Sequence, residues 1–100
     1  MMTIREVISK ADELNEYLVI YAKRQDGKFL SSSEAVLLDL TDEEKELLTH
    51  EIANKYCPGF DYFLEVFLVK EMVEDLRASE EYKSLEKQVE RIIYYAEFDA

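Results

Sequence analysis

The segment HEIANKYCPG (residues 50–59) holds the side chains best suited to chemistry, including the chain's only histidine, His50, and its only cysteine, Cys57. It begins like the zinc-protease pattern His-Glu-x-x-His, in which two histidines share one helix face. Asn54 stands where the second histidine would be, and the sequence contains no other. A catalytic zinc ion usually needs three protein ligands. We therefore expect His50 to face solvent, and we predict neither a metal site nor a cofactor.

Cys57 could act as a nucleophile only with a base such as His50 within reach. Seven residues separate the two, which is roughly 10 Å of helical rise. A reactive thiolate also needs positive surroundings, whereas the region around Cys57, residues 39–75, has a net charge of −8. We expect Cys57 to be a small apolar residue at a helix end, with Pro58 and Gly59 turning the chain. No phosphate-binding glycine loop or distinctive carboxylate pair is present, so the sequence predicts a non-enzyme without catalytic residues.

The elements that position these residues begin with a helix over residues 3–14. Thr3 and Glu6 have the spacing of a capping box, and apolar residues recur at helical spacing behind them. The stretch EYLVIYAKR (residues 16–24) is rich in β-branched and aromatic residues, which is typical of a strand. The N-terminal region is therefore expected to be a helix followed by a strand.

A hairpin is expected next, because Asp26-Gly27 is a strong two-residue turn signal. The return strand would begin near Phe29, but three serines (residues 31–33) interrupt it. Either that strand is short, or a bulge or loop lies there. The stretch AVLLDL (residues 35–40) predicts a further strand or the second half of the same one.

One continuous helix is predicted from Thr41 to about Tyr56. Thr41 and Glu44 have capping-box spacing, and Pro58 limits the C-terminal end. On a helical wheel the buried face centres on Leu48, Ile52 and Tyr56. The acids of this segment then lie on the opposite, solvent-facing side.

The remaining chain predicts a strand and two helices. Residues 61–67 favour a strand with Tyr62, Leu64 and Val66 on one side. Two apolar stripes follow: Leu68, Val69, Met72, Val73 and Leu76, and, in a helix beginning near Glu80, Tyr82, Leu85, Val89, Ile92, Ile93 and Ala96. The order of elements indicates a single α+β domain over residues 1–100. We expect a small, mostly antiparallel sheet of three or so strands packed with about four helices.

The charge limits the classes of partner. The net charge is −11, and residues 39–75 contribute −8 of it. Nucleic acid and anionic membranes both require a basic surface, so neither is an expected direct partner. A basic protein is a plausible partner, and solubility alone is the other explanation of the charge. A single cysteine and the absence of a signal-peptide core favour a cytoplasmic location.

Acidic side chains on the predicted helix faces form a candidate partner-binding surface. Leu47 lies among them, either as an apolar contact residue in an interface or as cover for a neighbouring loop. An outward-facing tyrosine of the last helix is a further candidate. The predicted partner-binding residues are Asp42, Glu43, Glu46, Leu47, His50, Glu71, Glu74, Asp75 and Tyr94.

Both ends of the chain carry a resemblance. The C-terminal VERIIYYAEFDA and the N-terminal REVISKADEL are similar to the ends of small bacterial proteins that look like acidic immunity proteins. Such proteins belong to toxin–immunity systems, including contact-dependent growth inhibition. The resemblance implies a cytoplasmic protein that binds and blocks one cognate toxin. It transfers no residue-level contacts, because immunity proteins are matched to individual toxins.

The function expected from charge and resemblance together is neutralisation of a basic toxin domain, with a nuclease as the expected kind. A nuclease site is basic because it holds phosphate, so an acidic protein can occupy it without chemistry. The alternative is a phage- or plasmid-type acidic nucleic-acid mimic that inhibits a DNA-binding defence enzyme. A small enzyme and a plain adaptor domain also remain open, and the sequence does not indicate an oligomeric state.

Overall fold

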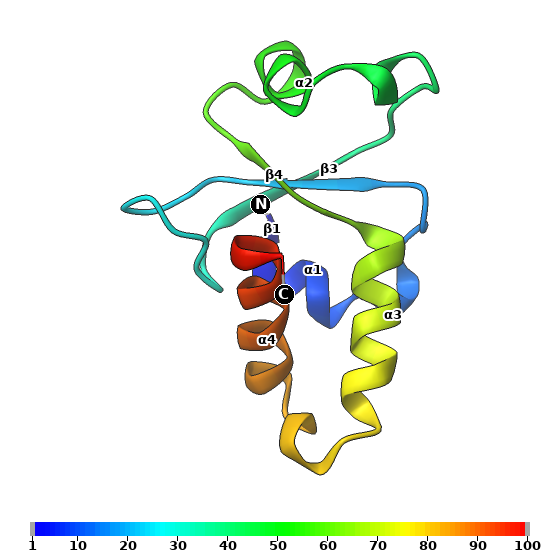
Figure 1. Cartoon of the computed structure of the whole chain (residues 1–100), viewed down its shortest axis with the longest axis vertical. Coiled ribbons are helices and arrows are strands. Elements are labelled where there is room, and N and C mark those ends of the chain that lie inside the picture. The colour runs from blue at the N-terminus through cyan, green and yellow to red at the C-terminus, as the bar shows by residue number, and fades with distance from the viewer. Residues whose placement is uncertain (1, 100) are drawn as a thin grey trace.

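A computed structural model of the chain describes residues 2–99 as one antiparallel sheet with helices on both faces (Figure 1). The strands are β1 (Met2–Thr3), β2 (Val19–Ala22), β3 (Glu34–Leu38) and β4 (Asp61–Glu65), in the order β1-β3-β2-β4. The helices α1 (Ile4–Ser9), α3 (Val66–Arg77) and α4 (Leu85–Phe98) cover one face, and α2 (Thr49–Tyr56) lies over the other. The predicted α+β class is confirmed.

The N-terminal helix begins where the capping box predicts. The Thr3 hydroxyl accepts a hydrogen bond from the Glu6 amide at 3.2 Å, and the Glu6 carboxylate accepts one from the Thr3 amide at 3.1 Å. The helix is shorter than predicted, because α1 ends at Ser9 and a separate 3₁₀ turn, η1 (Ala11–Glu13), follows. The edge strand β1 pairs with β3 and was not predicted, since two residues carry no readable alternation.

The turn at Asp26-Gly27 is confirmed. Both residues have positive φ, +53° and +77°, and the flanking residues Gln25 and Lys28 exchange two backbone hydrogen bonds. Of the alternatives left open after this turn, the loop is the one found: no strand begins near Phe29, and the strand predicted over residues 35–40 corresponds to β3. The Ser33 hydroxyl accepts a hydrogen bond from the Leu30 amide at 2.8 Å, which folds that loop back on itself.

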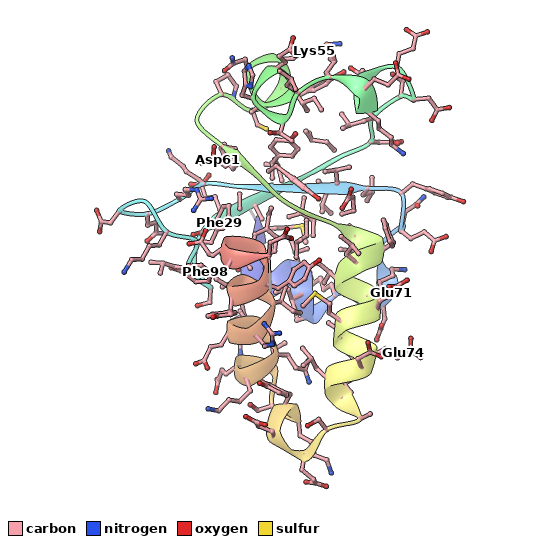
Figure 2. The ribbon with its side chains drawn as sticks, in the orientation of Figure 1. Phe29, Lys55, Asp61, Glu71, Glu74 and Phe98 are labelled. Carbon is pink, nitrogen blue, oxygen red and sulfur yellow. The ribbon has the colours of Figure 1, made fainter. Side chains whose placement is uncertain are left out.

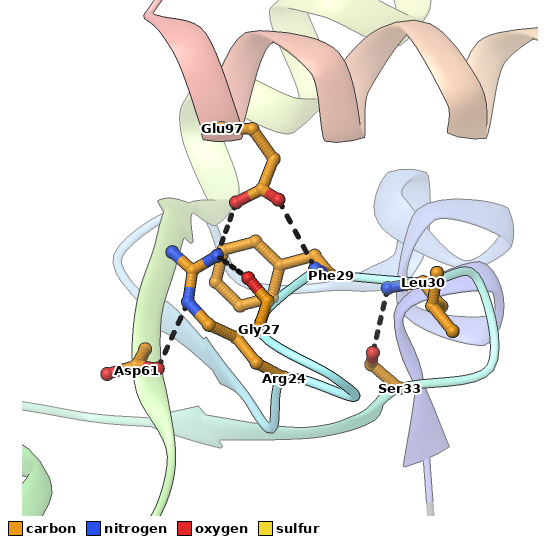
Figure 3. Close-up of polar contacts among 7 residues, drawn as sticks. All are labelled: Arg24, Gly27, Phe29, Leu30, Ser33, Asp61 and Glu97. Carbon is orange, nitrogen blue, oxygen red and sulfur yellow. Dashed lines mark hydrogen bonds and ion pairs between the residues drawn. The ribbon is translucent and has the colours of Figure 1, made fainter.

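An arginine ties the hairpin to the last helix (Figure 3). The Arg24 guanidinium donates to the Glu97 carboxylate of α4 at 2.5 Å and to the Asp61 carboxylate of β4 at 3.2 Å. It also lies 4.0 Å from the centroid of the Phe29 ring. Because Phe29 is buried, this cluster fixes the hairpin against the sheet and α4.

Strand β2 divides the apolar core into two parts, because its side chains alternate between the faces of the sheet. Ile20 and Ala22 point toward α1, α3 and α4, and Val19 and Tyr21 point toward α2. The larger core contains Ile4, Val7, Ile8, Ala11, Ile20, Ala22, Phe29, Ala35, Phe63, Leu64, Val66, Val69, Val73, Val89 and Ile92. The smaller core contains Val19, Tyr21, Leu40, Ile52, Ala53 and Cys57.

The prediction that Tyr62, Leu64 and Val66 share one side of a strand over residues 61–67 is wrong. Tyr62 pairs with Tyr21, but Leu64 pairs with Ile20, so Phe63 is an extra residue in β4. Such a bulge reverses the alternation, and it puts Leu64 in the larger core while Tyr62 stays on the α2 face. Val66 already begins α3.

The predicted continuous helix from Thr41 to Tyr56 is also wrong. Thr41 and Glu44 do form a reciprocal cap, but it starts only the 3₁₀ turn η2 (Glu44–Glu46). Leu47 and Leu48 are extended, with ψ of 155° and 149°, and α2 begins after them. Leu48 is consequently 61% exposed instead of buried, and of the predicted inner face only Ile52 lies in the core.

The two C-terminal helices agree with the predicted stripes. Val69 and Val73 of α3 and Val89 and Ile92 of α4 are buried in the larger core. The segment near Glu80 is a 3₁₀ turn, η3 (Glu80–Tyr82), and α4 itself starts after Ser84, whose hydroxyl accepts from the Lys87 amide. No helix within residues 2–99 has the length and apolar character needed to cross a membrane.

Candidate functional site

A groove with apolar and aromatic walls opens beside α2, and we call it the Tyr17–Phe67 groove. It consists of two adjoining pockets, of about 370 Å³ and 480 Å³, which share Glu16, Tyr17 and Phe67. Tyr17 is 66% exposed and Phe67 43% exposed. The first pocket is also lined by Val19, Tyr21, Leu40, Lys45, Leu47, Thr49, Ile52, Tyr62 and Glu65, and the second by Lys70, Glu71 and Glu74.

Tyr17 and Phe67 are neighbours in space because the segments before β2 and after β4 are joined there. The Val66 amide donates a hydrogen bond to the Leu18 carbonyl at 2.9 Å. Leu18 directly follows Tyr17 in the sequence, and Val66 directly precedes Phe67. The Asn15 side chain accepts from the Tyr17 amide at 2.9 Å and holds the turn that leads into β2. The sheet pairing therefore fixes the aromatic part of the groove.

The segment around η2 supplies two further lining residues of the first pocket, Lys45 and Leu47. The Lys55 ammonium donates to the Glu44 carboxylate at 2.7 Å, and the Tyr56 hydroxyl donates to the same carboxylate oxygen. These bonds lower the pKa of Glu44 from 4.5 to about 2, with Lys55 as the first cause and Tyr56 as the second. The carboxylate is therefore charged at neutral pH and fastens η2 to α2.

Two tyrosine hydroxyls lie at the floor of the groove. The Tyr62 hydroxyl donates to the Glu65 carboxylate at 2.6 Å, and the Tyr21 hydroxyl donates to the Thr49 carbonyl at 3.3 Å. Burial raises the pKa of Tyr62, and the bond to Glu65 raises it further. Burial also raises the pKa of Tyr21. Both hydroxyls stay protonated at neutral pH, so they act as hydrogen-bond donors and not as bases.

An acidic strip continues the groove along α3. At 100° per residue, Phe67, Glu71 and Glu74 share the helix face opposite the buried Val69 and Val73. Glu71 and Glu74 point outward from α3 (Figure 2) and line the second pocket with Phe67. An aromatic ring is thus followed by two carboxylates on one exposed helix face.

The structure brings only some of the predicted partner-binding residues together. Leu47, Glu71 and Glu74 line the groove. The other predicted acids are exposed on the two segments that flank it, but they do not line it; these are Asp42, Glu43, Glu46 and Asp75. Tyr94 is exposed elsewhere, on α4, where its ring packs against Phe98 with centroids 4.8 Å apart.

His50 and Cys57 do not form a site together. Cys57 is buried in the smaller core, and burial raises the pKa of its thiol, which disfavours a thiolate at neutral pH. His50 is exposed and lines a separate pocket of about 250 Å³ with Asn54 and Asp61. Within residues 2–99, no three His, Cys, Asp or Glu side chains are grouped so that they could hold a metal ion.

The aromatic residues of the groove, Tyr17 and Phe67, were missed because both were assigned to predicted strands. A signal for Phe67 does exist, since a helical wheel started at Val66 puts this ring opposite the apolar stripe of α3. For Tyr17 the signal is weaker. Asn15 lies two residues earlier and is typical of a turn, which indicates that the strand begins after Tyr17. Their proximity depends on the pairing of β2 with β4 and has no local signal.

The whole chain, residues 1–100, matches a protein family described as Domain of unknown function (DUF7716), and the chain belongs to this family. Comparison with curated proteins and with solved structures finds no match. The family description assigns no activity, so a functional argument has to start from the groove and its charges.

Proposed function

We propose that this member of the DUF7716 family is an immunity-type inhibitor, which binds and neutralises a basic partner protein in the cytoplasm. The observation that supports it is the Tyr17–Phe67 groove, where exposed aromatic and apolar side chains are surrounded by carboxylates. The partner expected from this chemistry is a toxin domain whose own active site is basic, such as a nuclease. Inhibition then requires only binding, and no catalytic residue of this chain takes part.

The composition of the groove favours a protein as the partner. Protein–protein interfaces concentrate aromatic residues at the centre and polar residues at the rim. Tyr17, Leu47 and Phe67 supply the apolar centre here, and all three are exposed. Glu16, Glu71 and Glu74 lie at the rim. An interface of this kind loses little affinity to side-chain ordering, because aromatic rings have few rotatable bonds.

The charge around the groove favours a basic partner. The segment with Asp42, Glu43 and Glu46 lies on the η2 side of the groove, and α3 carries Glu71 and Glu74 on the other. Both belong to the part of the chain with a net charge of −8. A field of one sign on both sides of an apolar centre steers an oppositely charged protein and speeds association.

The direct test identifies a partner and then measures its activity. Tagged protein is used to capture partners from the organism that encodes it, and the dominant basic partner is purified and assayed with increasing amounts of the chain. We expect its toxic or nuclease activity to fall to zero at equal molar amounts. A partner that stays fully active when saturated would overturn the proposal. Capture of a DNA-binding defence enzyme would favour the nucleic-acid mimic instead.

Charge reversal tests the surface itself. Glu43→Lys with Glu46→Lys should slow association with the purified partner about tenfold at low salt, and by less at high salt, because screening weakens steering. The matched control is Glu81→Lys with Glu90→Lys, which changes the net charge equally at exposed sites away from the groove. Stopped-flow association rates measure both. Equal rates for the two double variants would show that overall charge, and not this surface, controls binding.

A further inference from the structure

We propose that the Tyr17–Phe67 groove receives an arginine side chain of the basic partner, and that Lys45 covers the same position in the free protein. This inference rests on the proposed function, since it names the partner group that the groove binds. It is argued from the groups that line the groove, from the position of Lys45, and from a second cluster elsewhere in this chain.

The groove offers the groups that a guanidinium binds. Tyr17 and Phe67 present exposed rings, and cations are attracted to the faces of such rings. Glu16 lines both pockets beside them, and Glu65 lines the first. Arginine combines ring stacking with bidentate bonds to a carboxylate, which the compact ammonium of lysine does not.

The ammonium group of Lys45 is a cation that already lies over one of these rings. Its ammonium lies 6.0 Å from the centroid of the Tyr17 ring. Within residues 2–99 it has no carboxylate within ion-pairing distance, in contrast with Lys55, which lies 2.7 Å from Glu44. A separation of about 6 Å is the outer limit of an effective cation–π contact, so a better-placed cation can displace Lys45.

The same combination of groups holds an arginine at another place in this chain. Arg24 stacks on the Phe29 ring at 4.0 Å while its guanidinium donates to Glu97 and Asp61 (Figure 3). That cluster consists of one aromatic ring and two carboxylates from separate elements. The groove gathers rings and carboxylates from separate elements in the same way, and none of its lining residues is an arginine.

The charges that line the groove favour a positively charged side chain as its occupant. The carboxylates of the groove are Glu16, Glu65, Glu71 and Glu74, and its two cations are Lys45 and Lys70. The lining is therefore net negative, and it lies within a chain of net charge −11. Leu47 and Ile52 provide apolar surface beside the rings, so the arginine is expected to sit next to an apolar residue of the partner.

The test uses a peptide in which one arginine is flanked by leucines, acetyl-Ser-Gly-Leu-Arg-Leu-Gly-Ser-amide, together with versions that carry lysine or the neutral isostere citrulline. Two-dimensional NMR follows the titration. We expect the arginine peptide to shift the amides of residues 16–18 and 65–67 and the terminal methylene protons of Lys45. The lysine peptide should bind about threefold more weakly, and the citrulline peptide should not bind. Equal binding of the arginine and citrulline peptides would overturn the proposal.

Two pairs of variants localise the binding. Tyr17→Ala should weaken binding of the arginine peptide about fivefold, whereas Tyr94→Ala removes another exposed tyrosine and should have no effect. Lys45→Met should strengthen binding about threefold and by more than Lys87→Met, which removes an exposed positive charge outside the groove. Tyr17 and Lys45 are both exposed, so the variants are expected to fold. If the two variants of either pair changed the affinity for the arginine peptide equally, the proposal would be contradicted.

These outcomes are separable from those of the inhibition assay, because the peptide titration contains no cognate partner. If the captured partner is inhibited but no arginine peptide binds, the inhibitor proposal stands and the arginine site is wrong. If the peptide binds at the groove but the partner stays active, the arginine site stands and the inhibitor proposal fails.

Discussion

The two faces of the sheet differ in how completely they are covered. On one face, α1, α3 and α4 enclose a large core that includes the fully buried Ile4, Ile20 and Ile92. On the other face, α2 contributes Ile52 and Ala53 to a much smaller core. Several residues of the smaller core also line the Tyr17–Phe67 groove, and these are Val19, Tyr21, Leu40 and Ile52. The thinly covered face therefore leaves part of its own core open to the first pocket of the groove, while the second pocket lies along α3.

The physical reason lies in the amount of apolar area that each face removes from water. Burial stabilises by about 25 cal/mol per Å² of apolar surface, so the face with three helices supplies most of the stability. The α2 face is then free to keep exposed apolar side chains such as Leu48. Stability and binding are divided between the two sides of one short sheet; the first and third comparisons below test this division, and the second tests how the thickly covered side is held together.

The largest expected effect comes from truncating one isoleucine on each face. Ile92→Ala should cost about 4 kcal/mol and Ile52→Ala about 2 kcal/mol, because the closed core around Ile92 keeps a cavity while the groove beside Ile52 can collapse or admit water. Urea unfolding of both variants measures the two losses. Equal losses would show that the α2 face is as important to stability as the other.

The next effect concerns the ion pairs that support the thickly covered face. Arg24→Met should cost about 2 kcal/mol, because it leaves the Glu97 carboxylate, which is only 16% exposed, without its main partner. The matched variant Arg77→Met breaks an exposed pair with Asp12 and should cost about 0.5 kcal/mol or less. Thermal unfolding compares them. A similar cost for both would mean that the hairpin is not fastened to α4 through Arg24.

The smallest effect is a pH dependence on the α2 face. The pKa of Glu44 is lowered in the folded protein to about 2, so its ion pair with Lys55 stabilises fully above the ordinary value of 4.5 and this stabilisation is lost as the pH falls toward 2. Glu44→Gln should therefore be less stable than the wild type at pH 6, and the difference should shrink below pH 4.5. Unfolding curves at several pH values measure it.

The control for this titration is Glu86→Gln, which removes an exposed carboxylate 3.9 Å from Arg5 on the opposite face. Its stability should follow that of the wild type across the same pH range, since such exposed pairs contribute little. If the Glu44→Gln difference stayed constant from pH 6 to pH 3, the cluster of Glu44 with Lys55 and Tyr56 would not hold η2 against α2.

The prediction of the site was weaker than the prediction of the fold. Leu47, Glu71 and Glu74 are predicted from helical wheels; Leu47 lines the first pocket and the two glutamates line the second, and their role in partner binding stays a prediction. The wheel for residues 41–56 assumed a single helix, so it misplaced Leu48 and Tyr56, which are exposed. Tyr17 and Phe67 are fifty residues apart and meet only because β2 pairs with β4. No short window of sequence shows that these two residues line the same pockets.

The sequence by itself determined the features that local chemistry controls. The positive-φ turn at Asp26-Gly27 follows from residues that tolerate that conformation. The cap at Thr3, the buried stripes of α3 and α4 and the acidic character of residues 39–75 follow in the same way from nearby residues.

Only the tertiary structure decided where the second helix begins, how β4 is bulged and where the groove lies. The local sequence offers two places where a helix can begin. The Glu44 carboxylate accepts a hydrogen bond from the Thr41 amide, and the Glu51 carboxylate accepts one from the Leu48 amide. Packing of Ile52 and Ala53 against the sheet favours the second start and leaves the segment before it extended. The extra residue at Phe63 similarly lets both Phe63 and Leu64 enter the larger core. Burial against distant residues outweighs local propensity at these places, since each buried side chain contributes more free energy than the choice between two caps.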